Sequence, residues 1–176
     1  MSERWQVEPE PGLLLLELYD EALPAVFGYL LSRSGSRTLA EDLTAETFVA
    51  AMGSLRARTT SQPTVAWLIG IARHKLVDHW RRAERDERAI RVLSGGLVGP
   101  EDPWESEIDA IRARGVLMRL GAPHRAALTL RYLDGLSVPE VAAHLDRTIH
   151  ATEALLVRAR AAFRRSYERE EGESGG

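Results

Sequence analysis

The chain of 176 residues contains no cysteine, which excludes disulfide bonds, cysteine-based zinc sites and thiol redox switches. It also lacks any apolar run near the roughly 20 residues that a membrane-spanning helix needs. The short run at 13–16 follows acidic rather than basic residues, unlike a secretory signal. These absences predict a cytoplasmic protein without membrane insertion. Lysine is scarce as well, since Lys75 is the only one among 23 basic residues.

An overall excess of positive charge is also absent, because the formal net charge is −3. By itself this value argues against nucleic-acid binding. The charge is unevenly distributed, however. Residues 83–107 carry three basic and seven acidic side chains, whereas residues 108–169 carry eleven basic and six acidic ones, a balance of +5. The basic surplus therefore lies in the C-terminal part of the chain, where it can attract phosphates.

Residues 136–165 are predicted to form two helices joined by a tight turn. Ser137 and Glu140 have the spacing of a capping box at the start of the first helix. The turn falls at residues 146–147, and Thr148 is expected to cap the second, longer helix. This order is typical of a helix-turn-helix, whose second helix enters the major groove of DNA.

The second helix has two contrasting faces. The helical period places an apolar set on one face, with Glu153 beside it: Ile149, Thr152, Leu156, Ala159 and Phe163. The opposite face carries His150, Ala154, Val157, Arg158, Ala161 and Arg165. Arginine can bond to guanine, and small apolar side chains can contact thymine methyls. The alternative is a helical hairpin whose arginines only face solvent.

The rest of the chain also favours helices, and no strand-like alternation or internal repeat occurs. The fold class is therefore all-α, with two small helical domains joined by a flexible linker, the second containing the helix-turn-helix. Helices are expected over 13–31 (restarting at Pro24), 38–55 (capped by Thr38 and Glu41), 64–91, 104–119 and 123–135. The glycine- and proline-rich segment 94–103 is expected to be the linker, and the acidic tail from Glu168 is expected to fray.

The helix at 64–91 interleaves positive charge with aromatic rings, as in the stretch Trp67 to Arg82. Cations can bind phosphates and rings can stack on unpaired bases, so this composition favours single-stranded or melted DNA. The alternative is a solvated helix that covers a core containing tryptophan.

Three blocks in order carry a family resemblance. They are AEDLTAETF at 40–48, WLIGIARHKLVDHWRR at 67–82, and HRAALTLRYLDGLSVPEVAAHL at 124–145, followed by a recognition helix ending in VRARAAFR. With their spacing they cover most of residues 13–165. On these residues the chain resembles the sigma-70 family, specifically the small extracytoplasmic-function (ECF) sigma factors of bacteria.

The resemblance implies a region 2 domain at 12–91, a linker at 92–106 and a region 4 domain at 107–168. It implies a sigma factor that binds core RNA polymerase and directs promoter-specific initiation. Region 2 would bind the coiled coil of the largest subunit and open the minus-ten element. Region 4 would bind the flap of the second subunit and recognise the minus-thirty-five element of promoter DNA. An anti-sigma factor is a further expected partner, and neither catalysis nor a cofactor is expected.

The resemblance also implies site residues. Polymerase binding is assigned to Asp42, Leu43, Glu46, Thr47 and Phe48. Minus-ten binding is assigned to Arg56, Arg58, Thr59, Thr60, Arg73, His74, Asp78, His79 and Arg82, with 56–64 as the loop that accepts a flipped base. Minus-thirty-five binding is assigned to His150, Glu153, Ala154, Val157 and Arg158 for bases, and to Arg125, Arg131, Arg147 and Arg164 for phosphates.

Three departures from the family pattern affect promoter sequence more than function. Ala45 stands where glutamine is common, Asp146 replaces the turn glycine, and the residues 150–152 replace Gly-Thr-Val. The first departure removes a polar side chain from the predicted polymerase contact.

Two other functions compete with this interpretation. One is a one-component helix-turn-helix regulator that binds an operator without polymerase, although such a protein does not need the basic-aromatic helix. The other is an enzyme. The five histidines form no zinc-protease pair with a glutamate, and no glycine-rich phosphate loop or G-x-S-x-G motif occurs, so catalysis is not expected.

Overall fold

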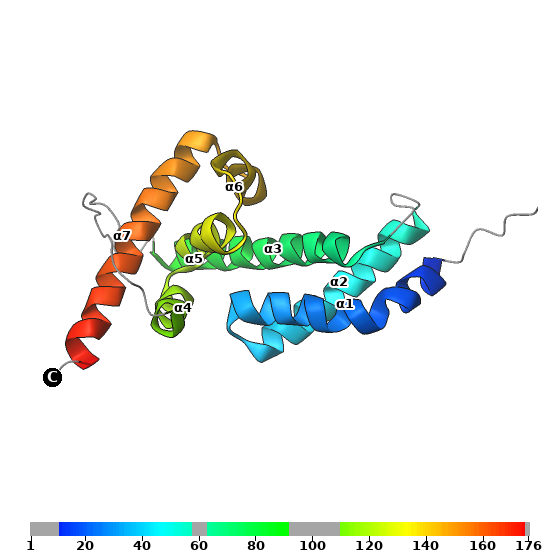
Figure 1. Ribbon diagram of the computed structural model, residues 1–176. Coiled ribbons are helices and arrows are strands. Elements are labelled where there is room, and N and C mark those ends of the chain that lie inside the picture. Colours follow the sequence, from blue (N-terminus) through cyan, green and yellow to red (C-terminus); the bar gives the residue numbers. More distant parts are fainter. Residues whose placement is uncertain (1–10, 58–62, 92–109, 175–176) are drawn as a thin grey trace, which may run out of the picture. The chain divides into compact units, whose positions relative to one another are not determined.

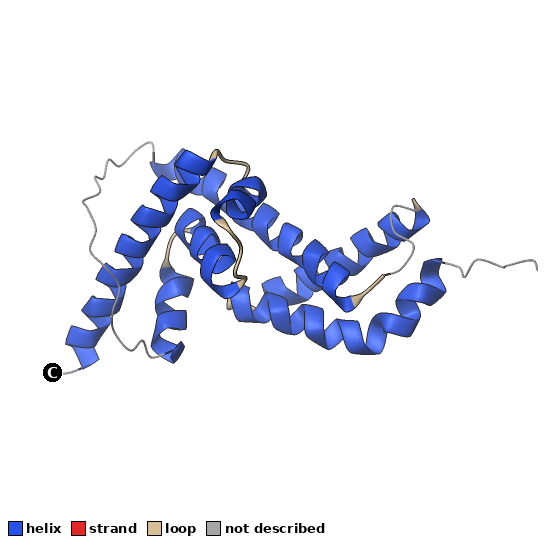
Figure 2. Ribbon diagram, turned by 45° about the horizontal axis from the view of Figure 1, so that its top comes forward, coloured by secondary structure: helices blue, strands red, loops and turns tan. Residues whose placement is uncertain are grey.

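The computed structural model describes residues 11–57, 63–91 and 110–174, and every regular element in these ranges is a helix (Figures 1 and 2). The prediction of an all-α fold is confirmed. By spatial contacts the chain divides into two units, one up to Leu76 and one from Val77, which are described separately. The predicted linker at 92–106 lies outside the described residues. The helices are α1 (Pro11–Ser34), α2 (Arg37–Arg56), α3 (Val65–Arg91), α4 (Ala110–Arg119), α5 (Ala122–Leu128), the π-helical turn η1 (Thr129–Leu133), α6 (Val138–Leu145) and α7 (Ile149–Ser174).

In the first unit, α1 and α2 pack against each other as a helical hairpin. Helix α1 continues through Pro24, so the predicted restart there is wrong. Proline removes one intrahelical hydrogen bond, but Pro24 is exposed and water can satisfy the carbonyl left without a partner. The buried side of α1 consists of Leu15, Ala22, Val26 and Leu30.

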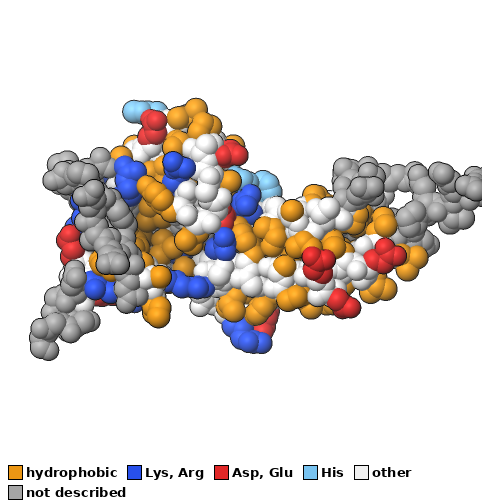
Figure 3. Space-filling model, in the orientation of Figure 1, with side chains coloured by type: hydrophobic (Ala, Val, Ile, Leu, Met, Phe, Trp, Pro, Cys, Tyr) orange, Lys and Arg blue, Asp and Glu red, His pale blue; other side chains and the backbone are white. Residues whose placement is uncertain are grey.

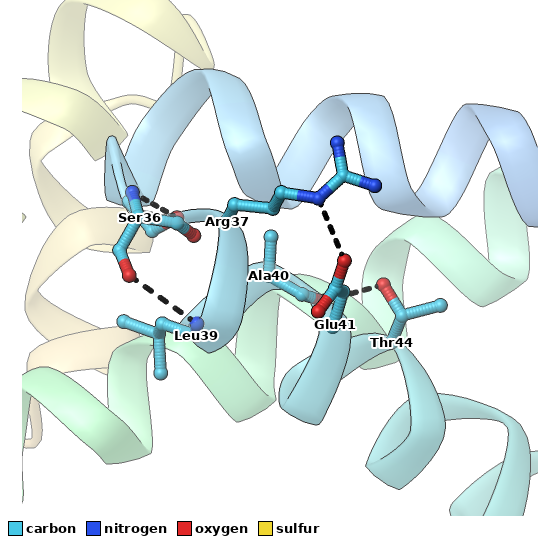
Figure 4. Close-up of polar contacts among 7 residues, drawn as sticks. Ser36, Arg37, Leu39, Ala40, Glu41 and Thr44 are labelled. Atoms are coloured by element: carbon cyan, nitrogen blue, oxygen red, sulfur yellow. Dashed lines mark hydrogen bonds and ion pairs between the residues drawn. The ribbon is translucent and has the colours of Figure 1, made fainter.

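A glycine turn separates α1 from α2. Gly35 has a φ of 68°, a conformation that favours glycine. Ser36 then takes an extended conformation, and its side chain accepts a hydrogen bond from the N–H of Leu39 at 3.3 Å (Figure 4). Ser36 therefore caps α2, and the predicted cap at Thr38 is wrong. Glu41 pairs instead with Arg37 at 2.9 Å (Figure 4).

Helix α3 confirms the predicted long helix. Thr64 caps it, since its hydroxyl accepts from the N–H of Trp67 at 3.1 Å. Its first half places Leu68, Ala72 and Leu76 in the core of the first unit. Each such leucine contributes about 1.5–3 kcal/mol when fully buried. Its second half belongs to the second unit, where Val77 and Trp80 are buried.

The second unit contains an irregularity that the sequence did not predict. The helix expected over 123–135 is α5 followed by η1, a turn of π-helix. Its end is closed by Gly135, with a φ of 69°, and by the N–H of Leu136, which donates to the carbonyl of Leu130 at 3.0 Å. This closure ends the helical segment before α6 begins at Val138.

The predicted helix-turn-helix is confirmed in α6 and α7. The carboxylate of Glu140 accepts from the N–H and the hydroxyl of Ser137, at 2.7 and 2.6 Å. Asp146 ends α6 in the left-handed conformation, with φ 54° and ψ 51°. This conformation favours glycine, although aspartate tolerates it better than most residues. Thr148 caps α7 by accepting from the N–H of Ala151 at 3.1 Å.

Helix α7 packs against α4, α5 and α6 and continues to Ser174, past the fraying predicted from Glu168. Contacts with α4 explain why it continues. Arg112 donates to the carbonyl of Tyr167 at 2.6 Å, and its guanidinium lies 3.9 Å from the centre of the Tyr167 ring. Such a cation–π contact contributes about 0.5–2 kcal/mol.

Candidate nucleic-acid interface

Helix α7, the predicted recognition helix, buries one face and exposes the other. Thr152, Leu156, Ala159 and Phe163 are buried, as the period predicts, together with Leu155. The prediction for Ile149 is wrong, because 51% of this residue is exposed. It lies in the first turn of α7, at the end of the buried stripe. A residue there has neighbours on one side only.

The exposed face combines small side chains with polar ones. His150 is 96% exposed in its side chain, and its Nδ1 lies 4.0 Å from a carboxylate oxygen of Glu153. Ala154 and Val157 are partly exposed, and Arg158 is exposed. Within the described residues Arg158 forms no hydrogen bond or ion pair. A guanidinium beside small residues can therefore reach base edges in a major groove.

The arginines predicted to contact phosphates also form polar contacts within the second unit. Arg125 donates to the carbonyl of Met118 at 3.0 Å, and Arg131 donates to that of Leu136 at 2.8 Å. Arg147 forms an ion pair with Glu84, in which the two side chains are only 21% and 14% exposed. Arg164 is half-buried. Phosphate contacts by these arginines remain a prediction.

Beside the ion pair of Arg147, Arg81 binds the carboxylate of Asp146 at 2.9 Å. Asp146, which stands where the family pattern has a turn glycine, thus forms an ion pair within the second unit. Because Asp146 is largely exposed, this pair contributes at most about 1 kcal/mol.

The residues predicted to bind the minus-ten element lie mainly on α3. His74, Asp78 and Arg82 are exposed and recur every four residues, so they form one stripe of this helix. Arg73 and His79 are half-buried beside it. Trp80 is buried in the core, as the alternative interpretation expects. Of the predicted loop residues, Arg56 is exposed at the end of α2, and Arg58, Thr59 and Thr60 lie outside the described residues.

The predicted polymerase contact lies on α2. Asp42 and Glu46 are exposed, and Glu46 lies 3.3 Å from Lys75. Leu43 and Thr47 are buried, so any role of theirs would be to position the exposed carboxylates. The half-buried Phe48 packs on the ring of Tyr19, with ring centres 5.3 Å apart.

Val49 is a surface residue that the sequence interpretation missed. It is 73% exposed and follows Glu46 by three positions, so it extends the acidic stripe of α2 with an apolar side chain. The sequence contained a signal for this exposure, because the position of Val49 does not match the spacing of the apolar residues on the buried face of α2.

Within the parts of the chain that the structure describes, no cluster of three or more histidine, aspartate or glutamate side chains could hold a metal ion. Nor does any described helix have the length and apolarity needed to cross a membrane.

Comparisons with known proteins agree with this arrangement. The sequence model of Sigma-70 region 2 matches residues 18–86, and that of Sigma-70 region 4 matches residues 112–163. The first match covers α2 and most of α1 and α3, and the second covers the helix-turn-helix.

Similar proteins include three ECF RNA polymerase sigma factors. SigD of Mycobacterium bovis is 32% identical, over 82% of this chain and 73% of that protein. BldN of Streptomyces coelicolor is 31% identical over 81% of this chain, which spans 56% of the length of BldN. SigM of Bacillus subtilis is 29% identical over 87% of this chain and 94% of that protein.

A solved structure has a related fold. The sigma factor RpoE from Bartonella quintana, in complex with the anti-sigma factor NepR, gives a TM-score of 0.52 at 23% identity. The match covers 89% of this chain and 96% of that chain. Taken together, the ordered matches to regions 2 and 4 and the identity to SigD show that this chain belongs to the sigma-70 family, among its ECF RNA polymerase sigma factors.

Proposed function

We propose that this protein is a dissociable initiation subunit, which binds core RNA polymerase and directs transcription from specific promoters. The observation that carries the proposal is the pairing of a region 2 match with a helix-turn-helix whose second helix exposes Arg158, Ala154 and Val157. A one-component regulator needs the second feature but not the first.

The side chains on each of three surfaces suggest which part of the polymerase or promoter that surface binds. The carboxylates of Asp42 and Glu46 on α2 can pair with arginines of the polymerase coiled coil, an interaction that favours specificity and rapid association. The stripe of His74 and Arg82 on α3 can hold melted minus-ten DNA. The exposed face of α7 can recognise the minus-thirty-five element.

We also retain the domain limits proposed from the sequence, with region 2 at 12–91 and region 4 at 107–168. Because the RpoE structure contains the anti-sigma factor NepR, we propose that a comparable inhibitor controls this chain. Its binding would compete with polymerase.

Promoter opening provides the test of this function. Single alanine substitutions of Arg73, His79 and Arg82 are expected to lower open-complex formation on duplex promoters by about tenfold. This is the size of effect for losing one hydrogen bond that involves a charged group. Binding to a duplex that contains only the minus-thirty-five element should change little. Permanganate reactivity of unpaired thymines measures the opening.

A pre-melted template separates melting from simple attraction. If the three residues stabilise unpaired DNA, a bubble at the minus-ten element should restore part of the lost activity, because the cost of unstacking has been removed. Arg169→Ala, which removes an exposed cation at the far end of α7, serves as the control and should open promoters normally. If the alanine variants lost affinity for duplex DNA and the bubble did not restore their activity, the three residues would only contact phosphates.

A further inference from the structure

Ile149, the first residue of α7, is an apolar side chain that the fold leaves partly exposed. This large apolar residue keeps 51% of its surface accessible to solvent, and in the second unit it lies directly beside the predicted base-reading residues. At the end of α7 next to α6, Figure 3 shows a histidine and an acidic side chain at the surface close to hydrophobic ones. The neighbours of Ile149 along the helix are His150 and, one turn later, Glu153.

Arg147, two residues before Ile149, is a predicted phosphate contact that also pairs with Glu84, but the charges within the first turns of α7 itself disfavour phosphates. From Ile149 to Val157 the chain has no lysine or arginine, and the side chain of Glu153 is 59% exposed. A carboxylate in this position repels phosphates. The first turns of a recognition helix nevertheless lie closest to base edges when the helix enters the major groove, so an apolar side chain there meets bases rather than backbone.

We propose that Ile149 is a specificity-determining residue, which recognises a thymine in the minus-thirty-five element by contact with its 5-methyl group. The proposal rests on the proposed function and goes beyond it by naming the base. In the major groove only thymine presents a methyl group, and apolar side chains recognise it. The contact would bury apolar surface on both partners, and the adjacent carboxylate of Glu153 would keep phosphates away from it.

Deoxyuridine gives the sharpest probe, because it differs from thymidine only by lacking this methyl group. Duplexes are first selected from a randomised pool with the wild-type chain assembled on core polymerase. Each thymine of the selected element is then replaced singly by deoxyuridine. At one position the wild-type affinity should fall about three- to fivefold, the effect of losing one buried methyl.

Ile149→Ala should bind the thymine duplex about three- to fivefold more weakly and should lose all sensitivity to deoxyuridine at that position, since coupled partners do not add. Ile149→Val, which keeps a branched apolar side chain, should retain part of the sensitivity. Ile111→Ala is the matched control, because it removes an equally apolar side chain that is 86% exposed on α4. It should leave the deoxyuridine profile unchanged.

The outcomes separate this inference from the proposed function. Specific duplex selection followed by the same deoxyuridine profile for wild type and Ile149→Ala would overturn the role of Ile149 alone. Selected elements without thymine would do the same. Failure of the assembled wild-type chain to select any duplex sequence would instead overturn the proposed function, and the inference with it. Because Ile149 is exposed, urea unfolding of Ile149→Ala should match the wild type.

Discussion

Reversal of two charges on α2, by Asp42→Arg together with Glu46→Arg, is expected to abolish binding to core RNA polymerase, with at least a roughly 100-fold loss of affinity. Close charge pairs across interfaces have coupling energies of about 1.5–7 kcal/mol, and two reversed charges turn attraction into repulsion. Fluorescence anisotropy of labelled protein with purified core polymerase measures the affinity. Asp42 and Glu46 are exposed, so the helical fold should be retained.

Helix α1 offers a matched control. Glu17 and Glu21 are exposed and have the same four-residue spacing, so Glu17→Arg/Glu21→Arg changes the net charge by the same amount. This variant should bind polymerase with near wild-type affinity. Glu46 also pairs with Lys75 at 3.3 Å, and urea unfolding checks that losing this surface pair costs no more than about 1 kcal/mol. Equal losses in both variants would indicate non-specific electrostatics, and unchanged binding of the α2 variant would refute the assignment.

Substitution of Arg158 by alanine should cost about 1–3 kcal/mol in binding to the minus-thirty-five element and relax the preference at one base pair. The reason is geometric. Arg158 is an exposed cation on the side of α7 that is predicted to face the groove, and no described residue holds its guanidinium. It is therefore available for two parallel hydrogen bonds to the O6 and N7 of guanine. A scan of base substitutions with wild type and variant measures the preference.

Arg164→Ala provides the contrast needed to separate base recognition from phosphate binding. If Arg164 contacts a phosphate, its loss should weaken binding evenly across sequences and reduce the salt slope by about one unit. Arg147→Ala is less informative, because it also leaves the half-buried Glu84 without its ion-pair partner. An unchanged base preference for Arg158→Ala would move base recognition toward His150 or Glu153.

Much of the second unit could be predicted because local signals agree there. The Ser137–Glu140 pair, the turn at 146–147 and the cap at Thr148 each have short-range causes, and the structure confirms them. Most of the buried face of α7 followed from the helical period, with Ile149 and Leu155 as the exceptions. The same holds for the length of α3, whereas its cap at Thr64 was not predicted.

The deviations arise from causes that sequence patterns do not contain. Ser36 rather than Thr38 caps α2. The turn at Gly35, which has a positive φ, ends α1 directly before Ser36, so α2 begins earlier than predicted. The π-helical turn at 129–133 is a rare local form of helix that the apolar periodicity of the sequence does not predict. The exposure of Ile149 depends on how far along α7 the neighbouring helices pack, which the sequence pattern does not specify. The ion pair between Arg147 and Glu84 joins residues 63 positions apart, beyond any local pattern.

Transcription in vitro shows whether this chain directs promoter-specific initiation by core RNA polymerase. Purified core polymerase is given the full-length chain and a promoter selected by the assembled complex, and transcripts are mapped at their first nucleotide. If the chain is an initiation subunit, the transcripts should have one defined start, should require the chain and both promoter elements, and should be lost with Asp42→Arg/Glu46→Arg. Transcription that is the same without the chain, or that survives scrambling of both elements, would contradict that role.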